Sequence, residues 1–393
     1  MTSTAAIKSL LAPQGWAYAS TPPVEADDPG RFHALFGRDS LIFSLQVLPV
    51  RPDIATATLR ALAARQGSRV DAEIDEEPGK ILHEYRPIAP AWLVDAGWPV
   101  RDGGLLYYGT ADATSWFLLV LAATGDRLLM DELGDAWRAA ADWLDRTLER
   151  GHGLVRHGPR GFPGGLSQQG WRDSNDPAGN AAGGGILRWD GSCPRAPLAD
   201  ADSQAVAVAA LRALTVIDAG RAAYWRDRLG ATRARIGRDF TPEMMAIEGN
   251  GEVVRGAGSQ LGWLMWAGAL TGDAADAAAD RLLQPDVLTP FGLRTLACTH
   301  PQFAPDAYHR GAVWPFDSWL GWGGLRAAGR AEEAERLRTG VLAAVAELGN
   351  APELYAVTRD GRPEPIPISN RVQAWTVGAT WALDARWDGR VID

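Results

Sequence analysis

Residues 166–177, LSQQGWRDSNDP, place an aromatic side chain, a cation and two carboxylates within six positions. Gly, Asn, Asp and Pro on both sides indicate a loop rather than a helix. The simplest interpretation is a turn in which Asp173 or Asp176 accepts a hydrogen bond from its own backbone. The alternative is acid catalysis, because the face of Trp171 can exclude water from Asp173 and raise the pKa of its carboxyl group.

The composition favours a sugar-binding enzyme over a nucleic-acid-binding protein. The 393 residues include 17 Trp against 7 Tyr and 9 Phe, and an indole ring can stack on the C–H bonds of a pyranose while its N–H group binds a hydroxyl. The formal net charge of −9 argues against nucleic acid or an anionic membrane as a partner. We therefore expect a small-molecule or oligosaccharide substrate; the sequence leaves the oligomeric state open.

The two cysteines, Cys193 and Cys298, lie far apart and form no disulfide framework, which fits a reducing compartment. The N-terminal segment has one Lys and an apolar stretch broken by Pro13, Gln14 and Gly15, which is atypical of a signal peptide. The longest apolar run, WFLLVLAA at 116–123, is too short to span a bilayer. These features predict a cytoplasmic protein.

A repeated helical pattern predicts the fold. In four stretches an apolar helical run ends near a glycine, at positions 125, 220, 272 and 329, and a charged residue opens a second amphipathic run. Glycine permits the left-handed conformation that closes a helix, and Asp is a good N-cap for the next helix. Eleven or twelve helices in about six hairpins, with apolar inner and charged outer members, predict an all-α (α/α)6 toroid.

Five longer links from an outer helix to the next inner helix mix carboxylates with aromatic residues. In a toroid such links lie on one face, where loops on a rigid scaffold are the expected form of an active site. The links comprise 73–87, 101–116, 164–179, 298–319 and 349–375.

Motifs in these links resemble the amylo-α-1,6-glucosidase domains of glycogen-debranching enzymes. They also resemble a wider set of inverting (α/α)6 glycoside hydrolases that includes glucosylglycerate and mannosylglycerate hydrolases. The resemblance runs from about residue 31 to 386, so we assign 31–393 to the catalytic barrel and 1–30 to a lead-in segment. The motifs are FGRDSLIFSLQ (36–46), DEEPGKILHE (75–84), YYGTADATSWF (107–117), QQGWRDSND (168–176), YHRGAVWPFDSWL (308–320), PELY (352–355) and RVQAWTVGA (371–379).

The resemblance implies two catalytic carboxyl groups. Inverting hydrolysis needs a protonated carboxyl group for the leaving oxygen and a carboxylate that activates water on the opposite sugar face. The Asp of the GWxDS motif corresponds to Asp173, the general acid, and the Glu of PELY corresponds to Glu353, the general base. Glu364, in RPEPIP, is the nearby alternative to Glu353.

The remaining site residues are predicted to bind the substrate. The resemblance places Arg38 and Asp39 at the closed end of the pocket, although Asp39 and Asp112 could each simply cap a helix. Trp314 is either a stacking platform or a core residue, and Glu76 fits a solvated charge run. The full predicted set is Phe36, Arg38, Asp39, Glu84, Tyr108, Asp112, Trp171, Arg172, Gln204, His309, Trp314, Gln373 and Trp375.

The sequence thus predicts an inverting, exo-acting α-glycosidase of the amylo-α-1,6-glucosidase type that needs no metal or other cofactor. Phe316 and Ser318 stand where debranching relatives are expected to carry His and Asn, which favours a small glycoside such as glucosylglycerate or mannosylglycerate as the alternative substrate. A sugar epimerase or isomerase, and a non-catalytic sugar-binding toroid, are alternatives of other classes.

Overall fold

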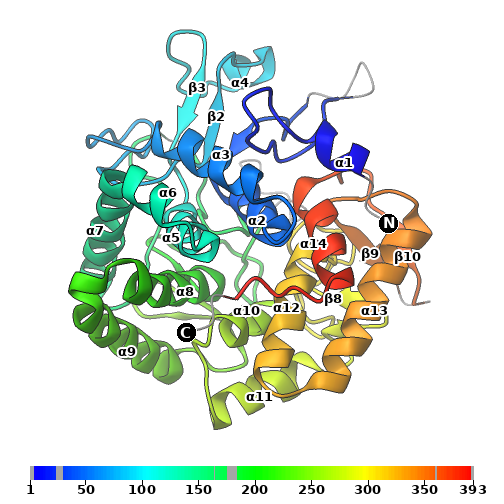
Figure 1. The fold of residues 1–393 in the computed structure, drawn as a ribbon. Coiled ribbons are helices and arrows are strands. Elements are labelled where there is room, and N and C mark those ends of the chain that lie inside the picture. Colours follow the sequence, from blue (N-terminus) through cyan, green and yellow to red (C-terminus); the bar gives the residue numbers. More distant parts are fainter. Residues whose placement is uncertain (1–3, 24–29, 163, 175–183, 359–360, 391–393) are drawn as a thin grey trace.

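Six helices form a closed inner ring in the computed structural model, which describes residues 4–23, 30–162, 164–174, 184–358 and 361–390 (Figure 1). Each of these helices contacts the next along the chain, and the last contacts the first, so the ring closes. They are α2 (Gly37–Val47), α5 (Ala113–Thr124), α8 (Ala201–Ile217), α10 (Gln260–Trp266), α12 (Pro315–Ala327) and α14 (Ala374–Asp384).

Five longer outer helices each pack against the inner helix that precedes them in the chain. The short helix α1 (Thr4–Ser9) contacts α14, and Ile7, Leu10 and Ala17 of the predicted lead-in segment join a cluster with residues of α2 and α14. This arrangement is the predicted (α/α)6 toroid. The outer helices are α3 (Pro52–Ala63), α7 (Gly134–Arg150), α9 (Ala222–Asp239), α11 (Asp273–Leu282) and α13 (Ala331–Leu348).

The segment before α2 and the links from each outer helix to the next inner helix contain ten short strands among the described residues, in two three-stranded and two two-stranded antiparallel sheets. Strands of two to four residues are too short to show an alternating pattern, so the sequence did not predict them. They are β1 (Leu35–Phe36), β2 (Glu84–Arg86), β3 (Leu105–Tyr107), β4 (Ala199–Asp200), β5 (Met244–Ile247), β6 (Val253–Arg255), β7 (Leu288–Thr289), β8 (Gly292–Leu293), β9 (Tyr355–Val357) and β10 (Pro363–Pro365). The short helix α4 (Ala91–Asp95) lies in the link from α3 to α5, whereas α6 (Arg127–Glu132) and η1 (Ala219–Arg221) each lie between an inner helix and the outer helix that follows it.

The predicted glycine turns are confirmed at two of four positions. Gly125 ends α5 with a φ of 62°, and Asp126 then caps α6 by accepting from the N–H groups of Leu128 and Leu129. Gly329 follows α12 with a φ of 76°. The prediction was wrong at Gly220, which lies inside η1, and at Gly272, which precedes α11 after the earlier helix has already ended at Trp266.

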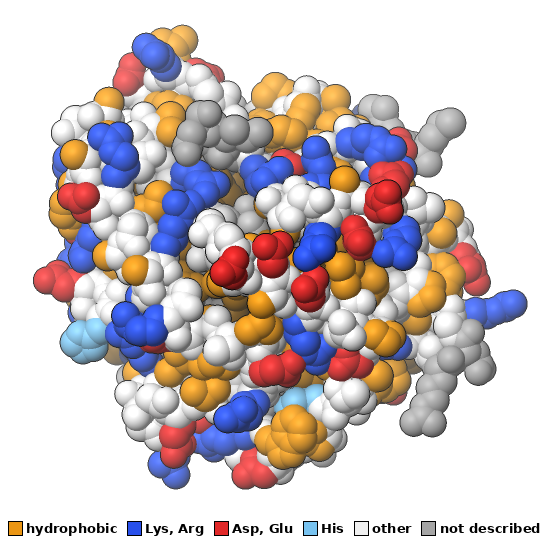
Figure 2. All heavy atoms as spheres, turned by 90° about the horizontal axis from the view of Figure 1, so that it is seen from below, with side chains coloured by type: hydrophobic (Ala, Val, Ile, Leu, Met, Phe, Trp, Pro, Cys, Tyr) orange, Lys and Arg blue, Asp and Glu red, His pale blue; other side chains and the backbone are white. Residues whose placement is uncertain are grey.

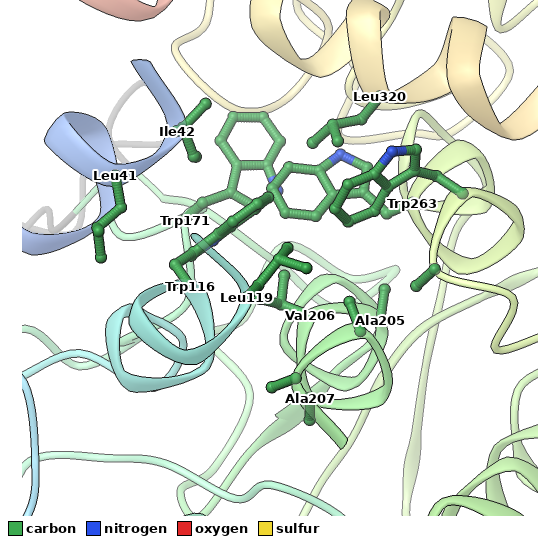
Figure 3. Packing of buried hydrophobic residues seen from close by; sticks show 14 of the residues in the cluster. Leu41, Ile42, Trp116, Leu119, Trp171, Ala205, Val206, Ala207, Trp263 and Leu320 are labelled. Carbon is green, nitrogen blue, oxygen red and sulfur yellow. The ribbon is translucent and has the colours of Figure 1, made fainter. Parts of the chain in front are cut away.

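Buried tryptophans fill the space inside the inner ring. Figure 3 shows Trp116, Trp171 and Trp263 lying together between inner helices, with Leu119, Val206 and Leu320 around them. The inner helices are buried on nearly all sides, whereas α7 and α11 bury one face.

Two inner helices cross at their backbones. A Cβ atom at Gly262 of α10 would lie 2.5 Å from the Cα of Gly321 of α12, and one at Gly324 would lie 2.3 Å from the Gly262 carbonyl oxygen. Since no larger residue fits these positions without displacement, the glycines set the close approach of α10 and α12.

The surface carries charges of both signs. On the face shown in Figure 2, basic and acidic side chains are interspersed with hydrophobic ones, so this face presents no continuous basic surface. In the part of the chain that the structure describes, no helix is both long and apolar enough to cross a bilayer.

Candidate active site

The first turn of α2 brings two charged residues, Arg38 and Asp39, to the loop face of the toroid. The N–H of Gly37 donates to the carbonyl oxygen of His83, and a Cβ atom at Gly37 would lie 2.1 Å from the carbonyl oxygen of Leu82. Glycine at position 37 therefore allows the 82–84 segment to pack directly against the start of the helix.

Arg38 connects two acidic residues from different links. Its Nε lies 2.8 Å from Oδ2 of Asp112, and its Nη1 donates to Oδ2 of Asp173 over 2.7 Å. The side chain of Asp112 is 1% exposed, and that of Asp173 is 21% exposed. Asp173 is thus the partner of Arg38 that a ligand can reach. Asp176, the other acidic residue of the loop, lies outside the described residues.

Neither Asp39 nor Asp112 caps a helix through its side chain. Asp39 lies inside α2, whose N-cap is Phe36, and its Oδ1 accepts from Nε2 of Gln373 over 3.3 Å. Asp112 is the N-cap residue of α5, but its side chain makes no capping bond and accepts from Arg38 and Thr110 instead. Burial raises the pKa of Asp39 to about 7, with a smaller contribution from the charge of Asp173.

Glu353 lies in the link between α13 and α14 and is 1% exposed. The hydroxyl of Tyr308 donates to Oε1 of Glu353, and the N–H of Asn370 donates to Oε2 over 3.3 Å. Burial raises the pKa of Glu353 to about 8, and these two hydrogen bonds oppose the rise. Glu364, the alternative base, is instead exposed on β10, where it accepts from Thr358.

The buried acids interact electrostatically. Burial raises the pKa of Asp173, and the charge of Asp112 adds to the effect although Arg38 opposes it. Asp39 and Asp173 both contribute to the raised pKa of Glu353. Because like charges at close range cannot all stay ionised, the cluster favours retention of a proton near neutral pH. A site that retains a proton on a carboxyl group can perform general acid catalysis.

An aromatic cluster supports the acid loop. Trp171 is 1% exposed, lies parallel to Trp263 with 5.8 Å between ring centroids, and meets Trp314 and Phe316 edge to face. Phe316 in turn stacks on Trp375, with centroids 4.1 Å apart. The side chain of Trp171 therefore packs in the core behind Asp173, which fixes the loop.

His309 joins the acid loop to this cluster. Its ring is parallel to that of Trp314, with centroids 5.3 Å apart, and its Nδ1 lies 2.8 Å from Oγ of Ser174, the residue after Asp173. Burial lowers the pKa of His309 far below its ordinary value, so the imidazole is neutral.

Several residues predicted to bind substrate have their polar atoms occupied by the protein. Arg172 is buried, and its guanidinium binds Asp202, Ser259 and the carbonyl oxygen of Thr295. The amide Nε2 of Gln204 donates to two main-chain carbonyl oxygens, and its Oε1 accepts from the N–H of Val155. The contacts of Arg172 and Gln204 therefore give no support to a direct role in binding.

Three further predicted residues lie in the β1–β2–β3 region. Glu84 pairs with Arg86, the hydroxyl of Tyr108 donates to the carbonyl oxygen of Arg65, and Phe36 packs edge to face on His83. Their role in binding stays a prediction. The prediction for Glu76 was wrong: it is 6% exposed and accepts from the N–H of Ser68, so it folds its own loop rather than facing solvent.

Sequence reasoning missed groups that complete the site. Tyr308 belongs to one of the motifs and stands directly before His309, but the motif did not predict a role for it. Asn370 and Thr110 were missed because a single amide or hydroxyl in a loop carries no distinctive pattern. The buried pair of His157 and Asp200, 2.7 Å apart, was also missed; Nδ1 of His157 accepts from the N–H of Gln169 and so holds the acid loop.

The site contains carboxylates but no evident metal centre within the described ranges, where no three His, Cys, Asp or Glu side chains converge in a way that could hold an ion. That the enzyme needs no metal stays a prediction.

A comparison with protein families gives the class of the protein. Residues 196–359, which include Tyr308 and Glu353, match the family described as mannosylglycerate hydrolase MGH1-like glycoside hydrolase domain. The chain is a glycoside hydrolase. The predicted resemblance to amylo-α-1,6-glucosidase domains stays a prediction.

Solved structures of similar fold extend over nearly the whole of this glycoside hydrolase. The GH63 mannosylglycerate hydrolase of Thermus thermophilus in complex with Tris and D-glycerate aligns with a TM-score of 0.71 at 16% identity, over 98% of this chain and 100% of the other. The complex of the same hydrolase with glucose aligns with a TM-score of 0.66 at 18% identity, over 98% of this chain and 99% of the other. Neutral trehalase from Saccharomyces cerevisiae aligns with a TM-score of 0.63 at 16% identity, over 95% of this chain and 73% of the other. At these identities the likeness establishes the shared fold.

Proposed function

We propose that this glycoside hydrolase removes the terminal sugar of a short α-glycoside with inversion of configuration. The observation that carries the proposal is the pair Asp173 and Glu353: both carboxyl groups are held on separate links of one face, the pKa of each is raised, and the charge of Asp173 acts on Glu353. Inverting hydrolysis requires two such carboxyl groups, one that donates a proton and one that activates water.

Asp173 is the proposed general acid. Arg38 donates to its Oδ2, so the proton is carried on Oδ1, and Trp171 and His309 fix the loop from behind. As the glycosidic bond breaks, the proton passes from Oδ1 to the leaving oxygen, and the resulting carboxylate is stabilised by the guanidinium.

Glu353 is the proposed general base. Tyr308 and the N–H of Asn370 donate to its two oxygens, and both bonds favour the ionised form. Glu353 takes a proton from a water molecule on the sugar face opposite Asp173, and this water attacks the anomeric carbon. Because burial raises its pKa to about 8, Glu353 is a strong proton acceptor once it is ionised, and its ionised fraction rises as the pH approaches 8.

The terminal sugar is proposed to lie among Arg38, Asp39, Gln373 and Trp375. Asp39 can accept from a sugar hydroxyl, and Gln373 has an amide that already connects Asp39 to Asn370. Buried polar groups such as the Asp39 carboxyl group and the Gln373 amide discriminate strongly between sugars. A sugar that lacks the matching hydroxyl leaves such a group without a hydrogen-bond partner.

A small glycoside such as mannosylglycerate or glucosylglycerate is the proposed substrate. Three observations support this choice: the family match over 196–359, the D-glycerate and glucose bound by the structural neighbour, and Phe316, which stacks on Trp375 where debranching relatives are expected to carry His. The second candidate, supported by the motif resemblance, is an exo-acting α-1,6-glucosidase.

Two measurements test the proposal. Proton NMR during the first minutes of turnover of an α-glycoside should show the β-anomer, and early α-anomer would exclude inversion. Release of monosaccharide from mannosylglycerate, glucosylglycerate, isomaltose-type oligosaccharides and a branched limit dextrin should then be compared. A clear preference for the branched polymer would replace the small-glycoside proposal with the second candidate.

A further inference from the structure

A second cavity, of about 350 Å³, lies beside the carboxylate site. Its lining includes Thr110 and Gln169, and both of these also accept from Nη2 of Arg38, over 3.5 and 3.4 Å. Asp173 and Glu353 are not among the lining residues, so the cavity is separate from this pair of acids. We refer to it as the Lys80 cavity.

The charge of the Lys80 cavity is opposite to that of the active site. Four cationic side chains line it, Lys80, Arg150, Arg156 and Arg160, with the single carboxylate of Glu77. Nη2 of Arg150 and Nη2 of Arg160 each lie 2.9 Å from one oxygen of Glu77. Glu77 is thereby fully engaged by two of the four cations.

The other two cations have only neutral hydrogen-bond partners among the described residues. Nζ of Lys80 donates to the carbonyl oxygen of Asp75 over 3.2 Å, and Nη1 of Arg156 donates to the carbonyl oxygens of Ile247 and Glu248 over 3.4 and 3.0 Å. Lys80 is 3% exposed. Burial lowers its pKa to about 8; the charges of Glu77 and Asp75 oppose this shift, and those of Arg160 and Arg150 add to it. An ammonium group so enclosed is stabilised by further negative charge.

We propose that the Lys80 cavity binds a small oxyanion carrying about two negative charges, either inorganic phosphate or the phosphoryl group of a small metabolite. Arg156 supplies planar N–H groups and Lys80 a point charge, the two kinds of donor that phosphate binding uses. The volume exceeds what a free phosphate fills and lies at the lower end of the range of small-molecule sites, so a phosphorylated metabolite also fits.

Binding at this cavity would be transmitted to the active site. An anion held by Lys80 and Arg156 contacts the wall formed by Thr110 and Gln169, and these two residues hold the guanidinium that orients Asp173. The Lys80 cavity is therefore a place where an anion can modulate hydrolysis without entering the sugar pocket.

The test is a binding measurement that does not depend on hydrolysis. Inorganic phosphate, glycerol phosphate and a hexose monophosphate are titrated into the full-length protein by calorimetry at constant ionic strength, with chloride as the reference anion. The Arg156→Gln variant should weaken binding of phosphate at least tenfold. Arg336→Gln, on the exposed outer face of α13, removes the same charge at a position away from the cavity and should leave the binding of phosphate unchanged. Arg160→Gln serves as the second variant if Arg156→Gln does not fold.

The binding measurements distinguish a site for a phosphate ester from a site for free phosphate, and they can also contradict the proposal. Tighter binding of one of the phosphate esters than of inorganic phosphate identifies a metabolite site, and the reverse identifies a site for the free ion. Absence of phosphate binding beyond that of chloride overturns the proposal, as does equal weakening by Arg336→Gln. Because the readout is heat of binding, the result stands whatever the glycoside substrate proves to be.

Discussion

Nη1 of Arg38 donates to Oδ2 of Asp173 over 2.7 Å, while Nε of the same guanidinium lies 2.8 Å from Oδ2 of Asp112. One cation thus fixes the orientation of Asp173, the proposed general acid, and of a second acid that stays buried. Burial raises the pKa of Asp173 despite this cation. Arg38 therefore sets the direction in which Asp173 presents its free oxygen, although its charge opposes the rise in pKa that lets this carboxyl group keep a proton.

Asp173→Asn should reduce hydrolysis of a glycoside with an alkoxide leaving group by about 10²–10⁴-fold, because an amide cannot donate the proton. The Asn carbonyl oxygen can still accept from Arg38, so the fold should be retained. A glycosyl fluoride needs little acid assistance and should be hydrolysed at a rate much closer to that of the wild type. Steady-state kinetics with both substrates provide the measurement.

The control for this variant is Asp142→Asn, on the exposed face of α7, which should behave like the wild type with both substrates. Equal loss of activity toward the natural glycoside and the fluoride would point to a damaged site rather than a missing proton. Activity within about tenfold of the wild type on the natural glycoside would remove Asp173 from the role of acid.

Glu353→Gln should abolish turnover while leaving the affinity for substrate within a few-fold, because the base acts on water rather than on the sugar. Calorimetry with an intact glycoside, beside a rate assay, separates the two effects. Glu364→Gln is a matched control from the neighbouring hairpin, since Glu364 is exposed on β10. Loss of turnover only in the Glu364 variant would move the base to that residue.

The ring of helices could be predicted from the sequence because an inner helix is apolar on nearly all sides and an outer helix on one face. These patterns span about 10 residues or more, and the glycines at 125 and 329 mark where they end. The turn at Gly272 was misplaced because α10 stops at Trp266, and the residues that follow are as apolar as the helix itself. The composition of this stretch gives no sign that α10 ends at Trp266.

The acids of the site could be identified from loop motifs, but their partners could not. Arg38 and Asp173 lie 135 positions apart, and nothing in either motif indicates that they touch. Arg172 stands next to Asp173 in the chain and yet points into the core, to Asp202. Adjacent loop residues point in different directions, so a motif gives the segment of a site and the fold decides which side chain faces the ligand.

Tyr308→Phe should shift the ascending limb of the pH profile of kcat/KM to higher pH. The hydroxyl of Tyr308 donates to Glu353 and lowers its pKa, so its removal raises that pKa and a higher pH is needed to ionise the base. A hydrogen bond to a charged group is worth roughly 1.5–3 kcal/mol, which corresponds to a shift of about one to two pH units.

Tyr224→Phe is the matched control for this shift, because the hydroxyl of Tyr224 on the outer helix α9 also donates to a carboxylate, that of Asp145 on the outer helix α7. It should leave the profile unchanged. A fall in kcat/KM by the same factor at every pH in Tyr308→Phe, with the limb in its original place, would show that Tyr308 contacts the substrate and does not tune the base.

The buried acids also predict how stability depends on pH. Asp317 of α12 is fully buried and accepts from Nε1 of Trp263 over 2.6 Å, and burial raises its pKa from 3.8 to about 7. Between these two values the folded protein holds a proton that the unfolded chain has lost. Stability should therefore fall as the pH rises from about 4 to 7, and the loss is complete above pH 7. Asp39 and Glu353 act in the same direction.

Asp317→Asn should reduce this dependence, because an amide keeps an oxygen for Trp263 and cannot ionise. We expect the melting temperature of the wild type to fall by several degrees between pH 5 and pH 8, and that of the variant to fall less, so that the variant is the more stable protein at pH 8. Each unit of pKa shift corresponds to roughly 1.4 kcal/mol, and Asp39 and Glu353 should leave part of the slope in place.

Asp227→Asn, on the exposed face of α9, is the control and should follow the wild type. Thermal unfolding followed by circular dichroism at several pH values provides the measurement. A variant whose melting temperature falls as steeply as that of the wild type would show that Asp317 is ionised in the folded protein, with Trp263 and its other neighbours compensating the buried charge.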